Sequence, residues 1–393
     1  MPELAEALAK ALDVVENADF SGYSKHDGLN ARWLERIAGT SRIRRLIAIQ
    51  SVMRTPVHIR PWIGVRKARN PKGLALLSRA YLSRYQMTGE AGYLDRARAL
   101  LDWLRDNTAP GWDSPCWGYP YPWQDVGFFA PRDYPNRVVT SFVVHGLLDG
   151  YEATGERSYL DTARGAVEFL LTAPRTLFED ERHRCVSYVP SDRIDWIVMD
   201  VSVLAGAAAA RLAALSGDEA LMHEAARLVR YVVDKQTEYG AWYYAEPPSA
   251  SHIRHDNYHT GFILDAILAY AMASGSDEFE TAYADGLRYY EQHLFEPDGA
   301  PRFMNDQRYP FDIHGAAQGI ITFSLAQRHR GTGGEVAARV AGWTLREMFD
   351  PRTGWFHYQK GRFFTNRVRL LRWCQCWMIW AISSYLENTE QEL

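Results

Sequence analysis

The sequence predicts an all-α fold in which six inner and six outer helices close into a toroid. Three observations support this: a helical phrase recurs along the chain, two kinds of helix alternate, and six segments qualify as inner helices. With 393 residues, 47% of them hydrophobic, the chain can bury a large core. We expect a single domain over residues 1–393, in which residues 1–70 complete a ring of hairpins repeated over residues 71–388.

The repeated sequence motif consists of a glycine, an acidic residue and an amphipathic segment. It reads TGEAGYLDRARALLDWLRDN from residue 88 and TGERSYLDTARGAVEFLLTA from residue 154, and weaker copies begin at 216, 274 and 331. Its glycines, Gly89, Gly155, Gly217 and Gly275, are 66, 62 and 58 residues apart. A glycine can end one helix in the left-handed conformation, and an acidic residue favours the start of the next. The motif therefore predicts a tight turn between two helices.

Two kinds of helix alternate around these glycines. Segments before each glycine, such as GFILDAILAYAMA, are apolar almost all round, whereas segments after it carry charges on one face. The first pattern is typical of buried helices and the second of helices that cover them. Five outer helices follow the glycines, and either residues 2–17 or residues 40–53 supply the sixth. We expect inner helices to start near residues 72, 137, 196, 260, 314 and 369.

Composition and charge limit the classes of partner. The net charge is −4 and the pI about 6.3, with both signs spread along the chain, so we expect neither a basic face for nucleic acid nor a polybasic membrane anchor. The most apolar stretch, 196–215, is interrupted by Asp200 and Arg211, which favours a buried helix over a membrane span. Four scattered cysteines suggest a reducing, cytoplasmic location. The sequence indicates no cofactor.

The connections from outer to inner helices are long, and they lie together at the end of the toroid where the inner helices begin. Long loops in a compact domain are usually functional. One of them carries a cluster of aromatic residues that includes Trp117 and Trp123. Flat rings can stack on pyranose rings, while Gln124, Asp125 and Asn136 could bind hydroxyl groups. A packed aromatic lid without a ligand is the alternative.

The other long connections repeat this combination of aromatic and polar residues at the expected mouth. Asp200 and Gln318 lie inside apolar helices, where an unpartnered polar group is costly. They could instead belong to a hydrogen-bond network between helices, and Asp195 could simply cap one. The further candidates for substrate binding are Asp195, Asp200, Trp242, Tyr244, Glu246, Gln318, Tyr358, Arg372 and Gln375.

Two short motifs carry the candidate catalytic residues. RHDNYHTGF, from residue 254, places Asp256 three residues before His259, and YPFDIHGAAQG, from residue 309, places Asp312 two residues before His314. Each motif opens an apolar inner helix, so Asp256 could also act as an N-cap alone. Two Asp and two His could in principle hold a metal, but their spacing matches no recognised metal motif, and the sequence predicts no metal site.

Taken together, the segments CWGYPYPWQD, SFVVHGLLDGYEATG, WYYAEP, DNYHTGF, YPFDIHGAAQGI and TNRVRLLRWCQCWM resemble bacterial and archaeal VpsJ-like proteins, which are associated with polysaccharide biosynthesis. The resemblance covers about residues 70–388. It implies the (α/α)6 six-hairpin toroid of a wide group of carbohydrate-active proteins, and a poly- or oligosaccharide as the substrate. It carries no catalytic residue over to this chain.

Three functions fit these candidates. Hydrolysis of a glycosidic bond needs two carboxyl groups, and Asp256 and Asp312 are the preferred pair. Lyases and C5-epimerases instead abstract a proton next to a uronate carboxylate. The residues suitable for this are Tyr244, Asn257, His259, His314 and Arg372. The third function is glycan binding without catalysis. The sequence favours a hydrolase, with uronate chemistry as the alternative and a non-catalytic role as the third.

Overall fold

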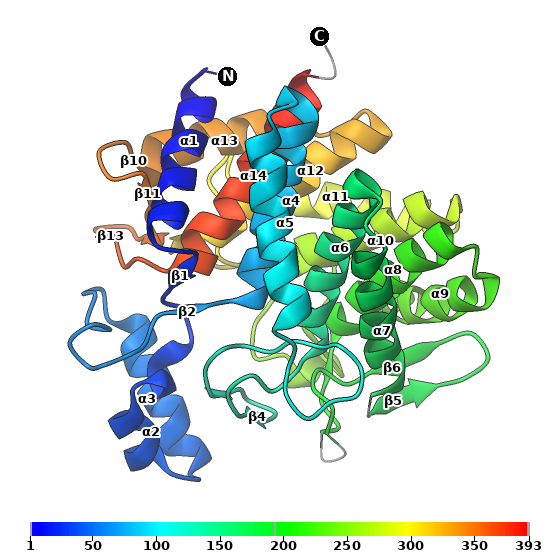
Figure 1. Ribbon diagram of the computed structural model, residues 1–393, viewed down its shortest axis with the longest axis horizontal. Helices are drawn as coiled ribbons and strands as arrows, with labels where there is room; N and C mark the ends of the chain where they lie inside the picture. Colours follow the sequence, from blue (N-terminus) through cyan, green and yellow to red (C-terminus); the bar gives the residue numbers. More distant parts are fainter. Residues whose placement is uncertain (1, 174, 192–193, 391–393) are drawn as a thin grey trace.

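The computed structural model describes residues 2–173, 175–191 and 194–390, and its helices form the predicted ring (Figure 1). Each inner helix contacts the next, and the last one returns to the first, so the ring is closed. A π-helical turn, Leu371–Cys376, leads into the last inner helix. The six inner helices are α4 (Pro71–Thr88), α6 (Arg137–Thr154), α8 (Met199–Ser216), α10 (Asn257–Ser274), α12 (Ile313–Arg330) and α14 (Trp377–Glu390).

Six outer helices cover this ring, and the sixth is the N-terminal one. α1 (Pro2–Asn17) packs against α14 and α13, whereas α3 (Arg42–Arg54) does not join the ring. The apolar face of α1, including Leu4, Leu8 and Val15, is buried there. The other outer helices are α5 (Ala91–Asp106), α7 (Arg157–Thr172), α9 (Glu219–Val233), α11 (Glu280–Leu294) and α13 (Gly334–Met348).

The inner helices end where the marker glycines predict. Gly89, Gly155, Gly217, Gly275 and a fifth, Gly331, are C-cap residues with φ between 67° and 70°. A side chain would be strained at this left-handed φ, whereas glycine adopts it freely. The N–H of each glycine bonds to the carbonyl four residues earlier, which closes the last helical turn.

Short β-ladders hold the long connections in place where the inner helices begin. β7 (Ile197–Val198) runs directly into α8 and β9 (Phe311–Asp312) into α12, so both helix starts are fixed by strand pairing. The ladders pair β1 (Ser21–Gly22) with β2 (Ala68–Arg69), β3 (Trp123–Gln124) with β4 (Phe129–Ala130), β5 (Thr176–Glu179) with β6 (Arg184–Val186), β7 with β8 (Ala245–Glu246), β9 with β12 (Gln359–Lys360), β12 with β13 (Thr365–Asn366), and β10 (Phe349–Asp350) with β11 (Trp355–Phe356).

The segment between α1 and α4 forms an appendage outside the ring. It contains η1 (Asp27–Asn30), α2 (Arg32–Ala38) and α3, which surround a small core of their own. Trp123 and Phe129 of the aromatic connection pack on that core and hold the appendage beside the mouth. Figure 1 shows it below β1 and β2, at the lower left.

One helix within the described residues, α8, is long and apolar enough to cross a membrane by length and composition. Of its apolar window, 78% is buried inside the molecule. α8 lies between α6 and α10 in the ring, so its apolar surface is used for packing on its neighbours.

Candidate active site

Three aromatic side chains divide the interior of the ring into two compartments. Phe142 of α6, Phe262 of α10 and Trp377 of α14 contact one another, with ring centroids 5.4 to 5.5 Å apart. We call this layer the aromatic septum. The N-terminal compartment, where the inner helices begin, holds the predicted catalytic residues. The C-terminal compartment contains a separate chamber.

Asp256 and His259 form a hydrogen-bonded pair in the N-terminal compartment. Asp256 occupies the N-cap position of α10, but its side chain makes no capping bond. Both of its carboxylate oxygens lie 2.9 Å from Nδ1 of His259. Burial disfavours the charged imidazole, but the Asp256 carboxylate outweighs burial and raises the pKa of His259. The carboxylate therefore orients the imidazole and favours its protonated form, which simple helix capping would not do.

His314 lies in the same compartment with neither ring nitrogen bonded. The side chain is buried, and both Nδ1 and Nε2 lack hydrogen-bond partners. Its ring stacks on Tyr258 at 4.7 Å and contacts Trp373 and Trp377 at 4.4 Å. Burial, reinforced by the positive charge of Lys72, lowers the pKa of His314 well below its usual value. His314 is therefore a neutral imidazole at physiological pH.

Both carboxylate oxygens of Asp312 have hydrogen-bond partners, unlike the ring nitrogens of His314. One carboxylate oxygen accepts from the main-chain N–H of His314 at 3.0 Å and from the indole of Trp373 at 2.7 Å. The other accepts from the side-chain amide of Gln359 at 2.8 Å. Asp312 thus caps α12, as its position predicts, and also fixes the indole that contacts His314.

Asp200 and Lys72 complete the floor of this compartment. Asp200 is buried with Oδ1 unpartnered, and burial raises its pKa. Lys72 is also buried, with Nζ 3.8 Å from the ring centroid of Phe142 and 4.5 Å from that of Phe262. Burial lowers the pKa of Lys72 well below its usual value. Sequence reasoning missed Lys72, although a lysine opening an otherwise apolar inner helix was a usable signal.

A segment from outside the repeats covers the mouth. Lys25 is buried, with Nζ 3.8 Å from the ring of Trp373 and 5.9 Å from that of Tyr358. The segment is anchored by the buried ion pair of Asp27 with Arg60, at 2.8 Å. No pattern in the sequence connects residues 24–27 with the repeats, so Lys25 was not a predicted site residue.

Four of the predicted binding residues line or border this compartment. The ring of Tyr244 lies 4.6 Å from that of His259, and Asp200, Tyr244 and His259 enclose a small cavity of about 10 Å³. Burial raises the pKa of Asp125 to about 6, although the positive charge of His259 acts to lower it. Arg372 lies 5.4 Å from the ring of Tyr119 and keeps an unpartnered Nε.

Two predicted sugar platforms are core residues. Trp117 and Trp242 are buried, and their indole N–H groups donate to Leu104 O at 3.0 Å and Val232 O at 2.9 Å. Trp242 also borders the small cavity beside His259, whereas Trp117 packs in the core, and a role in sugar binding stays a prediction for both. Trp123 is half-buried within a cluster of rings that includes Phe128 and Tyr188, as a packed lid would be.

Three polar candidates shape the loops. Asn136 caps α6 through Val139 N–H at 2.8 Å. The amide of Gln124 donates to two carbonyls of its own connection, at 2.8 and 2.9 Å. Gln375 accepts from Phe356 N–H at 2.9 Å and so holds the β10–β11 hairpin against the last inner helix. Each of these side chains has a main-chain partner, and their assignment to substrate binding stays a prediction.

Three further candidates lie away from the N-terminal compartment. The Asp195 side chain is 80% exposed and pairs with Arg175 at 2.7 Å. Glu246 pairs with Lys235 at 3.0 Å. Gln318 lies beyond the septum and lines the C-terminal chamber. Position near the start of an inner helix was therefore not sufficient to place these side chains at the mouth.

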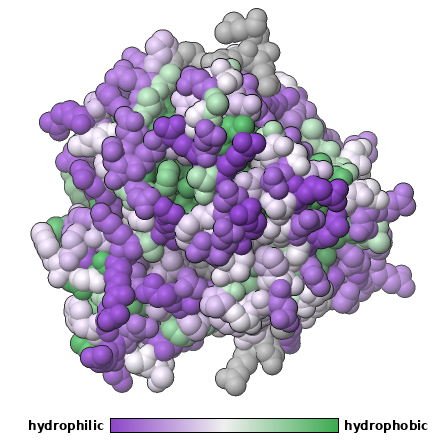
Figure 2. Space-filling model, viewed as in Figure 1, coloured by the Kyte–Doolittle hydropathy of each residue, from purple (hydrophilic) through white to green (hydrophobic). Residues whose placement is uncertain are grey.

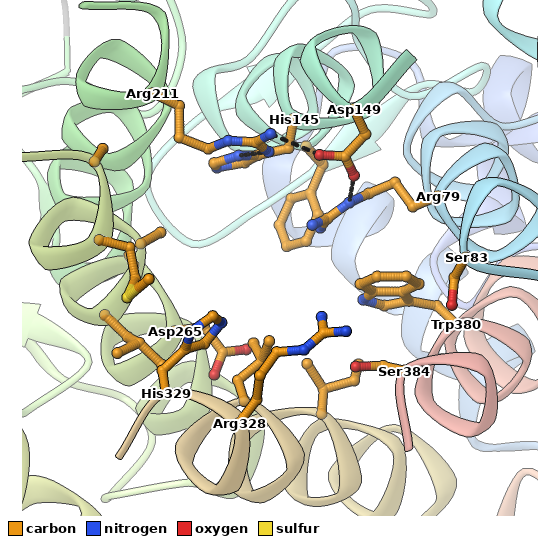
Figure 3. Close-up of a pocket in the computed structure, with 18 of the residues that line it drawn as sticks. Arg79, Ser83, His145, Asp149, Arg211, Asp265, Arg328, His329, Trp380 and Ser384 are labelled. Carbon is orange, nitrogen blue, oxygen red and sulfur yellow. Dashed lines mark hydrogen bonds and ion pairs between the residues drawn. The ribbon is translucent and has the colours of Figure 1, made fainter. Parts of the chain in front are cut away.

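The C-terminal halves of the inner helices surround a cavity of about 650 Å³ (Figure 3). Asp149 accepts from Arg79 at 2.6 Å and from Arg211 at 2.7 Å. Burial opposes the charge of Asp149, but the two guanidinium groups lower its pKa to about 2. Arg328 pairs with Glu387 on another part of the wall. Figure 3 shows these side chains converging on a central hollow.

Asp265 differs from the other acidic residues of the chamber. One of its oxygens accepts from Gln318 at 2.6 Å, and the other has no partner. Burial raises the pKa of Asp265 to about 7. The sequence analysis did not single out Asp265 or Asp149, although both interrupt helices that are otherwise apolar.

No family model matches the chain, and no curated protein matches its sequence. Solved structures match its fold. A cellobiose 2-epimerase from Bacillus thermoamylovorans aligns with a TM-score of 0.64 and 14% identity, over 82% of this chain and 88% of the epimerase. A GH76 α-mannanase from Bacteroides thetaiotaomicron aligns with a TM-score of 0.63 and 14% identity, over 82% and 87% of the two chains.

An unsaturated glucuronyl hydrolase specific for heparin covers all of this chain and 97% of its own, with a TM-score of 0.63 and 9% identity. At these identities the similarity establishes the fold, which is the predicted (α/α)6 toroid. Proteins of this fold perform different reactions, so the activity has to be argued from the site.

Proposed function

We propose that the chain is a carbohydrate-active enzyme that moves a proton on a sugar carbon, as sugar epimerases and polysaccharide lyases do. The observation that carries the proposal is the pair of imidazoles on either side of Tyr258. The ring of Tyr258 lies 4.4 Å from that of His259 and 4.7 Å from that of His314. One imidazole has a raised pKa and the other a lowered one. Titratable neighbours whose pKa values are pushed apart are typical of an acid and base pair.

His314 is the base in this mechanism and His259 the acid. The neutral ring of His314 has a free lone pair that can accept a proton from a carbon next to a carbonyl or carboxylate. Asp256 holds Nδ1 of His259 and stabilises its protonated form, which leaves Nε2 to donate to the substrate. Negative charge that develops on the substrate oxygen would be stabilised by Arg372, which is buried beside the cluster.

A poly- or oligosaccharide is the proposed substrate, in line with the VpsJ-like resemblance and with the saccharides named for the matched structures. We extend the proposal to a role in polysaccharide biosynthesis in the cytoplasm. The cavity beside His259 is about 10 Å³, which is far below the several hundred Å³ of a typical ligand pocket. Substrate entry therefore requires residues that enclose this cavity, among them Tyr243 and Tyr244, to move outward.

Hydrogen exchange with solvent tests the proposal. The protein is incubated in deuterated water with reducing disaccharides and with uronate-containing oligosaccharides, and the products are examined by NMR. We expect either deuterium at the carbon next to the carbonyl or carboxylate, as in epimerisation, or an unsaturated product, as in elimination. Either product should be lost in His314→Gln and His259→Gln. New reducing ends with neither deuterium nor an unsaturated product would contradict the proposal and indicate hydrolysis. Binding without exchange or cleavage would indicate a glycan-binding protein.

Hydrolysis by two carboxyl groups is the second candidate function, and the chamber supplies the observation that favours it. There Asp265 has a pKa of about 7 and Asp149 one of about 2, as a general acid and an ionised partner would. The pair Asp256 and Asp312 is less suited, because three donors occupy the oxygens of Asp312. Incorporation of ¹⁸O from water into new reducing ends, lost in Asp265→Asn, would support hydrolysis.

A further inference from the structure

We propose that the appendage and the adjacent β12–β13 hairpin form a docking surface for an anionic lipid bilayer. Between residues 31 and 70 the chain has ten Arg or Lys and one acidic residue, a net charge of +9. Because the whole chain carries −4, the remaining residues carry −13. The charges are therefore concentrated in one segment, contrary to the even distribution expected from composition.

The β12–β13 hairpin extends this basic character. Residues 359–370 contain four Arg or Lys and no acidic residue. Tyr23 connects the chain that follows β13 to the loop after α3, because its carbonyl accepts from Leu371 N–H at 3.0 Å and its ring lies 5.0 Å from that of His58. Figure 1 shows both segments on the left of the molecule. We call the exposed part of the two segments the basic face: Arg32, Arg36, Arg42, Arg44, Arg54, Arg66, Lys67, Arg362, Arg367 and Arg369.

The basic face also exposes large apolar side chains. Thirteen such side chains are exposed among the described residues, and eight of them lie on these two segments. Trp62 is 77% exposed and Phe363 is 88% exposed. A concentration of this kind usually marks an interaction site. The eight are Trp33, Ile37, Ile43, Ile47, Val57, Trp62, Phe363 and Phe364.

Hydrogen bonds connect the parts of the appendage that carry these side chains. The indole of Trp33 donates to Ile63 O at 2.8 Å, which joins α2 to the loop of Trp62. Arg44 of α3 donates to Ile37 O of α2 at 3.3 Å. Figure 2 shows apolar residues in green among hydrophilic residues in purple on this part of the molecule, at the lower left. The exposed apolar side chains of the appendage therefore belong to one surface.

The combination of side chains identifies the partner as a bilayer. Arginine binds lipid phosphate, and isoleucine, phenylalanine and tryptophan enter the boundary between headgroups and acyl chains. Nucleic acid binding would use the guanidinium groups but gives no reason to expose eight large apolar side chains. The appendage packs against the aromatic connection through Trp123 and Phe129, so docking would bring the mouth close to the membrane surface.

Vesicle flotation of the full chain tests this inference. The probes are phosphatidylcholine vesicles with and without phosphatidylglycerol. We expect at least about tenfold more protein on the anionic vesicles, and its release by salt, because exposed charges are screened. The variant Ile43→Ser/Ile47→Ser should lose about tenfold of this binding. Arg42→Glu/Arg44→Glu should lose more, because it reverses charge next to the lipid phosphates.

A matched control uses an exposed aromatic residue outside the basic face. Phe178 is 44% exposed on β5, and Phe178→Ser should float like the wild type. Ile43 and Ile47 are 69% and 60% exposed, so their double variant should show the same thermal unfolding as the wild type. Vesicles with brominated acyl chains should quench part of the tryptophan fluorescence of the wild type. This quenched part should be missing in Trp62→Phe.

Four results would overturn the inference. One is equal flotation with neutral vesicles, and a second is undiminished flotation of the Ile43→Ser/Ile47→Ser variant. Another is binding of duplex DNA by the wild type and this variant alike, with flotation of neither. The last is a dimer in light scattering that this variant converts to a monomer, again without flotation, which would assign the face to a second copy of the chain.

Discussion

The two compartments of the toroid are built from the same six helices, but their buried charges are satisfied differently. In the C-terminal chamber, Asp149, Arg79 and Arg211 satisfy one another through ion pairs, and one oxygen of Asp265 is left without a partner. In the N-terminal compartment, His314 and Asp200 are buried with atoms that have no partner. Buried polar groups are normally paired, so unpaired ones are candidates for interaction with a substrate. The comparison teaches that the larger cavity lies in the C-terminal chamber, whereas the two imidazoles lie in the N-terminal compartment.

The largest expected effect separates the compartments by activity. His314→Gln should lower kcat about 1,000-fold, or about 4 kcal/mol of transition-state stabilisation, because the proposed base is removed. Asp265→Asn should leave the rate within about twofold, because in this proposal it does no chemistry. Steady-state kinetics on the substrate identified by exchange measure both. If Asp265→Asn is the inactive variant instead, the chamber is the catalytic compartment.

The next effect concerns stability. Asp149→Asn should lower the free energy of unfolding by about 3 kcal/mol, because it leaves Arg79 and Arg211 without their shared carboxylate. Asp195→Asn is the matched control, since the exposed pair of Asp195 with Arg175 should contribute less than about 1 kcal/mol. Urea unfolding measures both. Equal losses would show that the chamber ion pairs do not stabilise the ring.

The third prediction, with a somewhat smaller expected effect, tests whether His259 is the general acid. Asp256→Asn removes the carboxylate that raises the pKa of His259, so the imidazole should lose its proton at lower pH. Activity that needs protonated His259 falls as pH rises through this pKa, and the variant should therefore lose activity earlier. We expect about a 100-fold loss, or about 2.7 kcal/mol, on the alkaline side. An unchanged pH–rate profile would exclude His259 as the acid.

The smallest effect is the pH dependence of stability in the chamber. The pKa of Asp265 is about 7 in the folded chain and about 3.9 in the unfolded chain. Between these values the folded state holds a proton that the unfolded state has lost, so the free energy of unfolding falls as pH rises. Asp265→Asn should remove this decline and stabilise the protein by about 2 kcal/mol above neutral pH. Thermal unfolding across pH, compared with wild type, tests it.

The ring could be predicted because its signals are local. Each marker glycine and the helices beside it can be recognised within a few tens of residues. The aromatic septum could not be predicted, because Phe142, Phe262 and Trp377 are more than 100 residues apart and meet only when the ring closes.

The candidate site was predicted only in part for the same reason. Asp256, His259, Asp312 and His314 are brought together as expected, because each motif opens an inner helix. The direction in which each side chain points could not be predicted from the sequence. Asp195 is on the surface. Asp200, five residues later, follows strand β7 and is buried.

Closure of the ring also has a consequence for synthesis of the chain. α4 packs against α14, which lies about 300 residues further along, so the first inner helix is made long before its neighbour. Contacts of such long sequence separation form slowly and leave apolar surface uncovered in the meantime. Leu74, which borders a small cavity together with Leu371 and Cys376, is among the side chains that depend on this closure. The nascent chain is therefore most prone to aggregation just before its last helix leaves the ribosome.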